Sequence, residues 1–257
     1  MSLLGRNSKE RKRLQKIQEK AEKKAEKKLK KKIKKEGIPD HLDIGVKILE
    51  SYVDFTLLDP RATDKDIVEL INIAAKNRYH AVVVPPVFVS FAKEYIQNKF
   101  EGKLDVVSVV GFPLGHTTTK AKIVEAKNLA RAGADEIEVS LDISMVKMGN
   151  YSTLKSELSK VVRAAKHKTV GVVLETAYLD DAEIEKVVKI CIKAKADYVM
   201  TSSGYAPIGA TLENVERIVL FADNRISVKA AGGVKTRMDA ESFVRIGASR
   251  VGTSRIL

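Results

Sequence analysis

Short runs of β-branched residues alternate with longer amphipathic stretches over most of the chain. The short runs predict strands at 53–57, 81–84, 105–110, 136–140, 170–174, 198–201, 226–229 and 250–252. Helical periodicity without internal Gly or Pro predicts helices at 64–77, 87–98, 118–132, 151–165, 181–196, 212–222 and 237–246. Strands that alternate with helices in this number predict a single (β/α)8 TIM barrel. A doubly wound open sheet is the alternative, but no G-x-G-x-x-G follows the first strand.

The N-terminal region follows a different pattern. Between Ser8 and Lys35 there is no Gly or Pro, and good helix formers dominate. The apolar positions form one narrow stripe, made of Leu14, Ile17, Ala21, Ala25, Leu29 and Ile33. A stripe this narrow and Ala-rich does not define a core. We therefore expect a basic N-terminal extension over 1–37, largely helical or frayed in solvent, ahead of a barrel over 38–257.

The charge of the chain is concentrated in that extension. The whole chain has 257 residues, with 46 Lys and Arg against 33 Asp and Glu. Residues 1–36 hold 16 of the basic and 5 of the acidic residues, so 30 basic and 28 acidic residues remain for the body. A nearly neutral body does not favour a protein that coats nucleic acid. Nucleic acid, an acidic partner or a coiled-coil partner are the hypotheses for the extension alone, which has no aromatic residue to stack on bases.

The remaining composition narrows the class of protein. Cys191 is the single cysteine, so no internal disulfide framework is expected. No apolar run approaches the roughly 18 residues that a membrane span needs, and no signal-type segment opens the chain. These features predict a cytoplasmic protein without membrane partners. The four histidines lack ligand partners at metal spacing, and no metal site is expected.

In a (β/α)8 barrel the chemistry lies at the C-terminal ends of the strands. Three glycine-containing segments follow the late predicted strands and include Gly204, Gly232, Gly233, Gly252 and Ser254. Glycines let backbone N–H groups approach an anion, and helix N-termini after strands seven and eight would add positive dipole ends. Tight turns alone could explain any one of these segments. Together they predict a phosphate site.

Several segments together resemble a known family. VDFTLLDP, GFPLGHTTTK, AGADEIEV, VVLETAYL, TSSG, VKAAGGVKT and RVGTS are similar, in order and spacing, to the motifs of deoxyribose-phosphate aldolase. The resemblance implies a (β/α)8 barrel and the reversible cleavage of 2-deoxyribose 5-phosphate to acetaldehyde and glyceraldehyde 3-phosphate. It also implies a lysine that forms a Schiff base, no metal or other cofactor, and a homo-oligomer.

The family's functional residues transfer position by position. Lys229 matches the lysine that assists catalysis, Asp54 matches the strand-one aspartate, and the strand-four aspartate of the proton relay becomes Glu138. The extra methylene moves that carboxylate by about 1 Å, a shift that can cost on the order of 100-fold in rate. The phosphate loops match Gly204, Gly232, Gly233 and Ser254.

The position of the Schiff-base lysine is the main departure. Met200 stands before Thr-Ser-Ser-Gly and has no amine, and Gly171 stands where strand five usually carries a lysine. One hypothesis is a barrel that binds a phosphorylated sugar or aldehyde but has lost or impaired aldolase chemistry. A second is an active aldolase or related imine enzyme that uses Lys229 as its nucleophile, if burial beside Met200 outweighs Glu138 in setting the pKa. A third is a non-enzymatic interaction module that acts through the basic extension.

Overall fold

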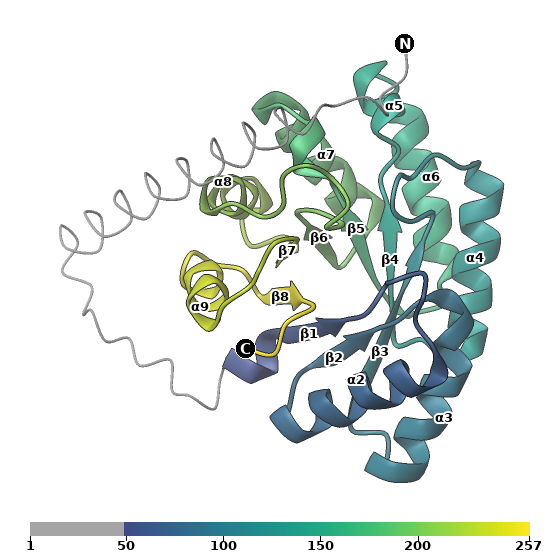
Figure 1. Cartoon of the computed structure of the whole chain (residues 1–257). Helices are drawn as coiled ribbons and strands as arrows, with labels where there is room; N and C mark the ends of the chain where they lie inside the picture. The colour runs from purple at the N-terminus through teal and green to yellow at the C-terminus, as the bar shows by residue number, and fades with distance from the viewer. Residues whose placement is uncertain (1–48) are drawn as a thin grey trace.

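The computed structural model describes residues 49–257, and the extension at 1–37 with its boundary lies outside them. Eight parallel strands close into a barrel in the order β1 to β8, and helices surround it (Figure 1). The strands are β1 Val53–Thr56, β2 Ala81–Val83, β3 Asp105–Val110, β4 Glu136–Ser140, β5 Thr169–Val173, β6 Tyr198–Met200, β7 Ser227–Ala231 and β8 Arg250–Thr253. The predicted (β/α)8 fold is confirmed.

The seven predicted helices are all present. They are α2 Asp64–Asn77, α3 Val89–Phe100, α4 Thr119–Ala132, α6 Tyr151–Ala164, α7 Asp181–Ala194, α8 Leu212–Ala222 and α9 Arg237–Arg245. The second predicted helix, at 87–98, began too early in the prediction, because Pro86–Phe88 forms a 3₁₀ turn before α3. The short helix α5, Ile143–Lys147, was not predicted, and it begins where the Asp142 side chain accepts from Ser144 N at 2.9 Å.

Alternation along each strand separates two cores. On β4, Ile137 and Val139 point outward and join the large cluster between the strands and the helices. Glu136, Glu138 and Ser140 occupy the other face, which lines the barrel interior. The sequence left open which face of this strand lines the interior, and the ion pair between Glu138 and Lys229 identifies the acidic one.

The β3–α4 loop is pressed against the end of β4. Gly115 has a φ of 68°, and a Cβ there would overlap the carbonyl oxygen of Leu141. Thr118 caps α4, because its side chain accepts from Ala121 N at 3.2 Å. Behind the loop, Lys122 of α4 is fully buried, and its Nζ lies 2.7 Å from Oε1 of Glu157 on α6.

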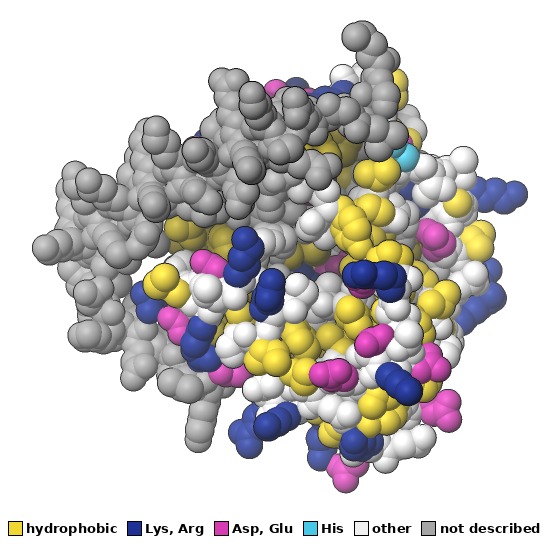
Figure 2. Space-filling model, viewed as in Figure 1, with side chains coloured by type: hydrophobic (Ala, Val, Ile, Leu, Met, Phe, Trp, Pro, Cys, Tyr) yellow, Lys and Arg dark blue, Asp and Glu magenta, His cyan; other side chains and the backbone are white. Residues whose placement is uncertain are grey.

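The surface of the barrel has no single-sign patch on the face shown in Figure 2. Basic and acidic side chains alternate there over the described elements. This distribution agrees with the near balance of charge outside residues 1–36. None of the helices in residues 49–257 combines the length and the apolar character needed to cross a membrane.

Candidate functional site

Lys229 lies at the centre of the barrel interior. It occupies the middle of β7 and not its end as predicted, because the strand continues to Ala231. Its Nζ lies 2.6 Å from Oδ2 of Asp54 and 2.6 Å from Oε1 of Glu138. Tyr198 donates its hydroxyl proton to the same Glu138 oxygen at 2.9 Å. The three residues carried over from the family therefore meet in one cluster.

The electrostatics of this cluster hold Lys229 as an ammonium ion. Burial alone would lower its pKa, but the charges of Asp54 and Glu138 outweigh burial, so the pKa is raised. Burial would likewise raise the pKa of Asp54, but Lys229 and Arg250 lower it, so this carboxylate stays charged. A nucleophilic amine must be unprotonated, and this environment favours the inert form.

A second set of charges lies toward the N-terminal end of the strands. Arg250, at the start of β8, donates to Glu136 at 2.8 Å and to Asp54 at 3.3 Å. Burial raises the pKa of Glu136, while its contact with Arg250 opposes that shift. Because Arg250 touches Asp54, this second set is continuous with the Lys229 cluster, and the barrel interior holds one ionic network.

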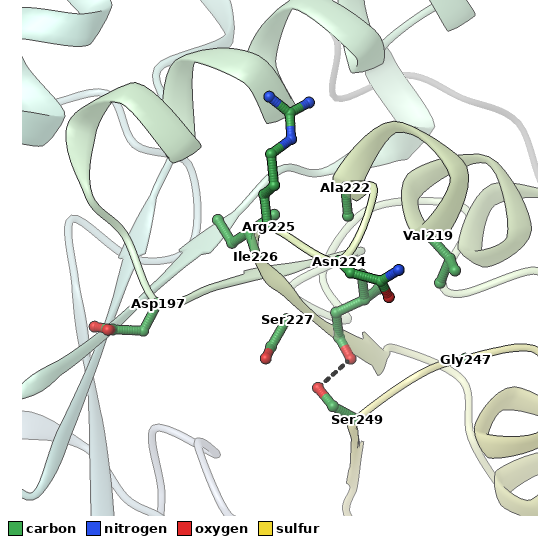
Figure 3. A pocket seen from close by; sticks show the side chains of 10 residues that line it. Asp197, Val219, Ala222, Asn224, Arg225, Ile226, Ser227, Gly247 and Ser249 are labelled. Carbon is green, nitrogen blue, oxygen red and sulfur yellow. Dashed lines mark hydrogen bonds between the residues drawn. The ribbon is translucent and has the colours of Figure 1, made fainter.

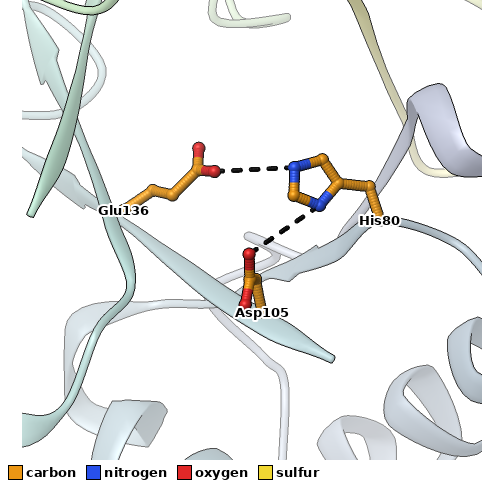
Figure 4. Close-up of side chains that lie close together, drawn as sticks. All are labelled: His80, Asp105 and Glu136. Atoms are coloured by element: carbon orange, nitrogen blue, oxygen red, sulfur yellow. Dashed lines mark ion pairs between the residues drawn. The ribbon is translucent and has the colours of Figure 1, made fainter. Parts of the chain in front are cut away.

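The described residues contain one group with ligand atoms close enough to suggest a metal site, formed by His80, Asp105 and Glu136. Nε2 of His80 lies 3.6 Å from Glu136, and Nδ1 lies 3.9 Å from Asp105 (Figure 4). The two carboxylates therefore approach different nitrogens of one ring, whereas a single ion binds a histidine through one nitrogen. Glu136 is also already paired with Arg250. The arrangement suits an imidazole between two carboxylates better than a ligand set.

Met200 lies directly beside Lys229. The two residues are register partners on β6 and β7. The Met200 side chain is 7% exposed and packs with Val173 and Ala231 in a small apolar cluster inside the barrel. A thioether has no amine to condense with a carbonyl. At the position expected for the Schiff-base lysine, the Met200 side chain therefore contributes packing contacts.

The ring of Tyr198 explains why strand β5 carries no side chain at position 171. A Cβ at this position would overlap the ring of Tyr198, its register partner on β6. The ring fills the space that a side chain on β5 would occupy, and its hydroxyl reaches Glu138. Two of the departures from the family pattern thus lie against the same network, one beside Lys229 and one beneath Glu138.

The candidate phosphate loops lie at the C-terminal end of the barrel. Gly204, Gly233 and Ser254 are exposed there, and Gly232 is half-buried. Both Gly204 and Gly232 have positive φ, and a Cβ on Gly204 would lie 3.9 Å from the Cα of Gly232. The loops after β6 and β7 are therefore in contact, and their glycines leave backbone accessible to an anion.

Two details of the predicted phosphate site are corrected. Gly252 lies within β8 and is buried, and a Cβ there would meet Cε of Lys229 at 3.1 Å. The missing side chain leaves room for Cβ of Ala231, at 2.8 Å from that position, and for the lysine stem. The helix expected after strand eight is also absent from the described residues, since α9 precedes β8 and residues 254–257 form no helix. Only the α9 N-terminus, after β7, remains as a dipole contribution.

Glu175, at the end of β5, was not recognised as part of the site. It has a left-handed backbone with φ 55° and is 7% exposed. One carboxylate oxygen accepts from Ser203 N at 3.2 Å and from the Ser203 hydroxyl, while the other oxygen has no partner. Burial raises the pKa of Glu175, and the bonds from Ser203 oppose that shift. Glu175 thus fixes the residue that precedes Gly204.

Tyr205 continues this connection across the barrel mouth. Its backbone N–H donates to Ser203 Oγ at 3.1 Å, and its hydroxyl donates to the carbonyl of Leu58 at 2.9 Å. Its ring meets Phe112 edge-on, with 5.4 Å between the ring centroids. The loops after β1, β3 and β6 are therefore tied together above the interior.

Two cavities lie away from the network. One, of about 340 Å³, opens at the N-terminal ends of β6 to β8 and is lined by Asp197, Asn224, Arg225, Ser227 and Ser249 among others (Figure 3). The other, of about 560 Å³, lies between β1 and α2 and includes Ser254 in its wall. The first is at the opposite end of the barrel from the candidate phosphate loops, so only the second adjoins the candidate site.

Comparisons with known proteins agree with this geometry. The family model described as DeoC/LacD family aldolase matches residues 48–252. A deoxyribose-phosphate aldolase of Thermococcus gammatolerans is 39% identical over 82% of this chain and 94% of the relative, and one of Clostridioides difficile is 38% identical over 79% and 91%. Among solved structures, the aldolase QR15 superposes with a TM-score of 0.77 at 37% identity, covering 80% of this chain and 91% of that one. A tetrameric deoxyribose phosphate aldolase from Aeropyrum pernix gives 0.76 at 32% identity, with 82% and 88% covered.

Proposed function

The chain belongs to the DeoC/LacD family of aldolases, and we propose that it binds a small phosphorylated sugar or aldehyde without carrying out the family's imine chemistry. The observation that carries the proposal is the environment of two neighbouring residues. Met200 occupies the position of the Schiff-base lysine, and the amine of Lys229 beside it is enclosed by two carboxylates. The exposed glycine loops keep the features suited to a phosphate.

Lys229 is a poor replacement for the missing nucleophile. In the family pattern two lysines stand next to each other, and like charges lower the pKa of at least one. With Met200 in place of the second lysine, that repulsion is gone. Burial still lowers the pKa of Lys229, but the attraction of Asp54 and Glu138 outweighs it. Loss of covalent catalysis removes the step that divides the barrier, so the rate should fall by many powers of ten.

Reductive trapping tests the chemical half of the proposal. The full chain is incubated with 2-deoxyribose 5-phosphate and borohydride, and its intact mass is measured. We expect no adduct on the unchanged chain and an adduct on Met200→Lys, because the new amine lies beside Lys229 and at the head of the Thr201–Gly204 segment. Met238→Lys is the matched control, since Met238 is 68% exposed on α9 and should give no adduct.

The opposite result is equally clear. An adduct on the unchanged chain that disappears in Lys229→Met would overturn the proposal and support Lys229 as the nucleophile. Circular dichroism of each variant establishes that it is folded, so that a missing adduct reports chemistry.

Ligand-induced thermal stabilisation tests the binding half. We expect 2-deoxyribose 5-phosphate to raise Tm and free 2-deoxyribose to leave it unchanged, because binding to the folded state raises apparent stability. Ser254→Asp should abolish the stabilisation by placing a negative charge in the exposed loop, whereas Ser156→Asp on an exposed part of α6 should not. Equal stabilisation by both sugars would contradict a phosphate site.

Two further properties complete the proposal. The tetrameric Aeropyrum pernix relative supports assembly of this chain into a homo-oligomer, which light scattering on the purified chain would test. The concentration of charge in residues 1–36 supports a polyanion or acidic partner for the extension. A chain that begins at Gly37 should then lose salt-sensitive binding to heparin and RNA. Equal binding by the two chains would eliminate that role.

A further inference from the structure

Apolar side chains line part of the barrel interior beside the ionic network. Toward β5, β6 and β7 it is lined by Val173, Met200 and Ala231. Toward β2 and β3 it is lined by a second apolar cluster of Ala81, Val83, Val107 and Val109, on which Leu58 and Phe112 pack. A ligand held at the glycine loops would therefore extend its carbon chain into apolar surroundings.

Ser140 is the exception in this lining. It ends β4 on the interior face and is the register partner of Val173, which in turn pairs with Met200. Ser140 is 1% exposed, yet its Oγ has no hydrogen-bond partner among residues 49–257. A buried hydroxyl without a partner has lost its hydrogen bonds to water and gained none in return, so such a group in a folded protein requires an explanation.

The backbone of Ser140 is held firmly while its hydroxyl is free. Its carbonyl accepts from Nζ of the buried Lys122 at 3.1 Å, and Lys122 is itself paired with Glu157. Gly115 packs against the neighbouring carbonyl of Leu141. The hydroxyl is therefore fixed on the interior wall of the barrel, next to the layer that contains Met200.

We infer that Ser140 is a specificity-determining residue that hydrogen-bonds an oxygen at the end of the ligand opposite its phosphate. The inference rests on the proposed function and names the ligand class more closely. The preferred ligand is a phosphomonoester of a short carbon chain with a hydroxyl or carbonyl oxygen at its far end. The neighbouring register partners Val173 and Met200 offer no second hydrogen-bonding side chain beside Ser140, so one oxygen is favoured over several.

Two probes that differ by one oxygen test the inference. Pentyl phosphate and 5-hydroxypentyl phosphate have the five-carbon length of 2-deoxyribose 5-phosphate, and their Kd values are measured by calorimetry on the full chain. The unchanged chain should prefer the hydroxylated probe, and Ser140→Ala should reduce that preference about tenfold while leaving the affinity for pentyl phosphate unchanged. Ser108→Ala is the matched control, because Ser108 is also buried but its Oγ already donates to Val84 O at 2.8 Å. This control should keep the preference.

The stability of the two variants gives an independent readout. Ser108→Ala should lower Tm, because it leaves the Val84 carbonyl without its partner, whereas Ser140→Ala should leave Tm unchanged or higher. An unchanged probe preference in Ser140→Ala, or a Tm loss equal to that of Ser108→Ala, would overturn the inference while leaving the proposed function intact. Failure of both probes and of 2-deoxyribose 5-phosphate to bind any folded variant would overturn both.

Discussion

Two fully buried lysines of this barrel have different surroundings. Lys122 lies between α4 and α6, where it contacts one carboxylate, Glu157, and the carbonyl of Ser140. Lys229 lies inside the strands, where it contacts Asp54 and Glu138 at 2.6 Å each. Both side chains are removed from water, and a buried charge is tolerated only when it is paired and hydrogen-bonded.

The difference is one of connectivity. Glu157 has one further partner, the Thr119 hydroxyl at 2.6 Å, so the Lys122 pair is a local unit. Asp54 also contacts Arg250, which contacts Glu136, so the Lys229 cluster continues through the barrel. A lysine in a separable pair serves packing, whereas a lysine in a continuous network cannot change its charge without affecting every neighbour. This connectivity supports the proposal that Lys229, with Met200 and no second amine beside it, stays a protonated ammonium ion and does not act as a nucleophile.

The largest expected effect is on stability when either lysine is removed. Lys229→Met and Lys122→Met should each lower the free energy of unfolding by about 3–5 kcal/mol, because each leaves a buried carboxylate unpaired. Lys229→Met should be the worse of the two, since both Asp54 and Glu138 lose their contact with the ammonium group. Urea unfolding followed by circular dichroism measures both.

Neutralising the carboxylates as well as the lysine distinguishes the isolated Lys122 pair from the connected Lys229 cluster. Lys122→Met combined with Glu157→Gln should recover most of the loss, because removing both charges of an isolated buried pair can be nearly neutral. Lys229→Met combined with Asp54→Asn and Glu138→Gln should recover only part, because Arg250 loses a counter-charge. Full recovery in both cases would refute the distinction between the two sites.

A smaller loss of stability is expected from a substitution at Gly171, which lies against the Tyr198 ring of the network. Gly171→Ala should cost about 1–3 kcal/mol, because the added methyl group overlaps the ring of Tyr198 in a packed interior. The double variant Gly171→Ala, Tyr198→Leu should recover part of that loss, and urea unfolding of the three chains gives the coupling energy. Additive costs would show that the ring does not explain the glycine.

Much of this fold follows from local patterns in the sequence. The number and order of strands and helices were predicted because each element is long enough to show its period. Helix α5 was missed because Ile143–Lys147 spans little more than one turn, too few residues for a helical repeat. Strand β7 was ended too early at Lys229, because a charged residue inside a barrel looks like the end of a strand when its partners are unknown.

The site could be predicted only where a motif fixes the position. Asp54, Glu138 and Lys229 were found through the family resemblance, and the structure brings them together. Arg250 and Tyr198 belong to the same network, but each stands at the start of a strand and gains its role from register with distant strands. The only available signal was their two-residue spacing from Gly252 and Met200, which places them on the same interior face.

Glu175 is the contrasting case, because among the described residues this buried carboxylate pairs with no cation. Burial raises its pKa, so its neutral form is favoured on folding. For an acid with a raised pKa, the stabilising contribution is present below the unfolded pKa and is lost as pH rises through the folded pKa. Glu175→Gln stays neutral throughout, so its free energy of unfolding relative to that of the unchanged chain should increase from acid to neutral pH.

The direction of this pH dependence shows whether Glu175 differs from the carboxylates that pair with Lys122 and Lys229. Denaturant unfolding at several pH values gives the difference between the two chains, and Glu213→Gln at the exposed start of α8 is the control, for which little change with pH is expected. A difference that instead moves toward the unchanged chain as pH rises would mean that Glu175 is stabilised as a carboxylate. Its bonds from Ser203 would then outweigh burial, and Glu175 would resemble the partners of Lys122 and Lys229.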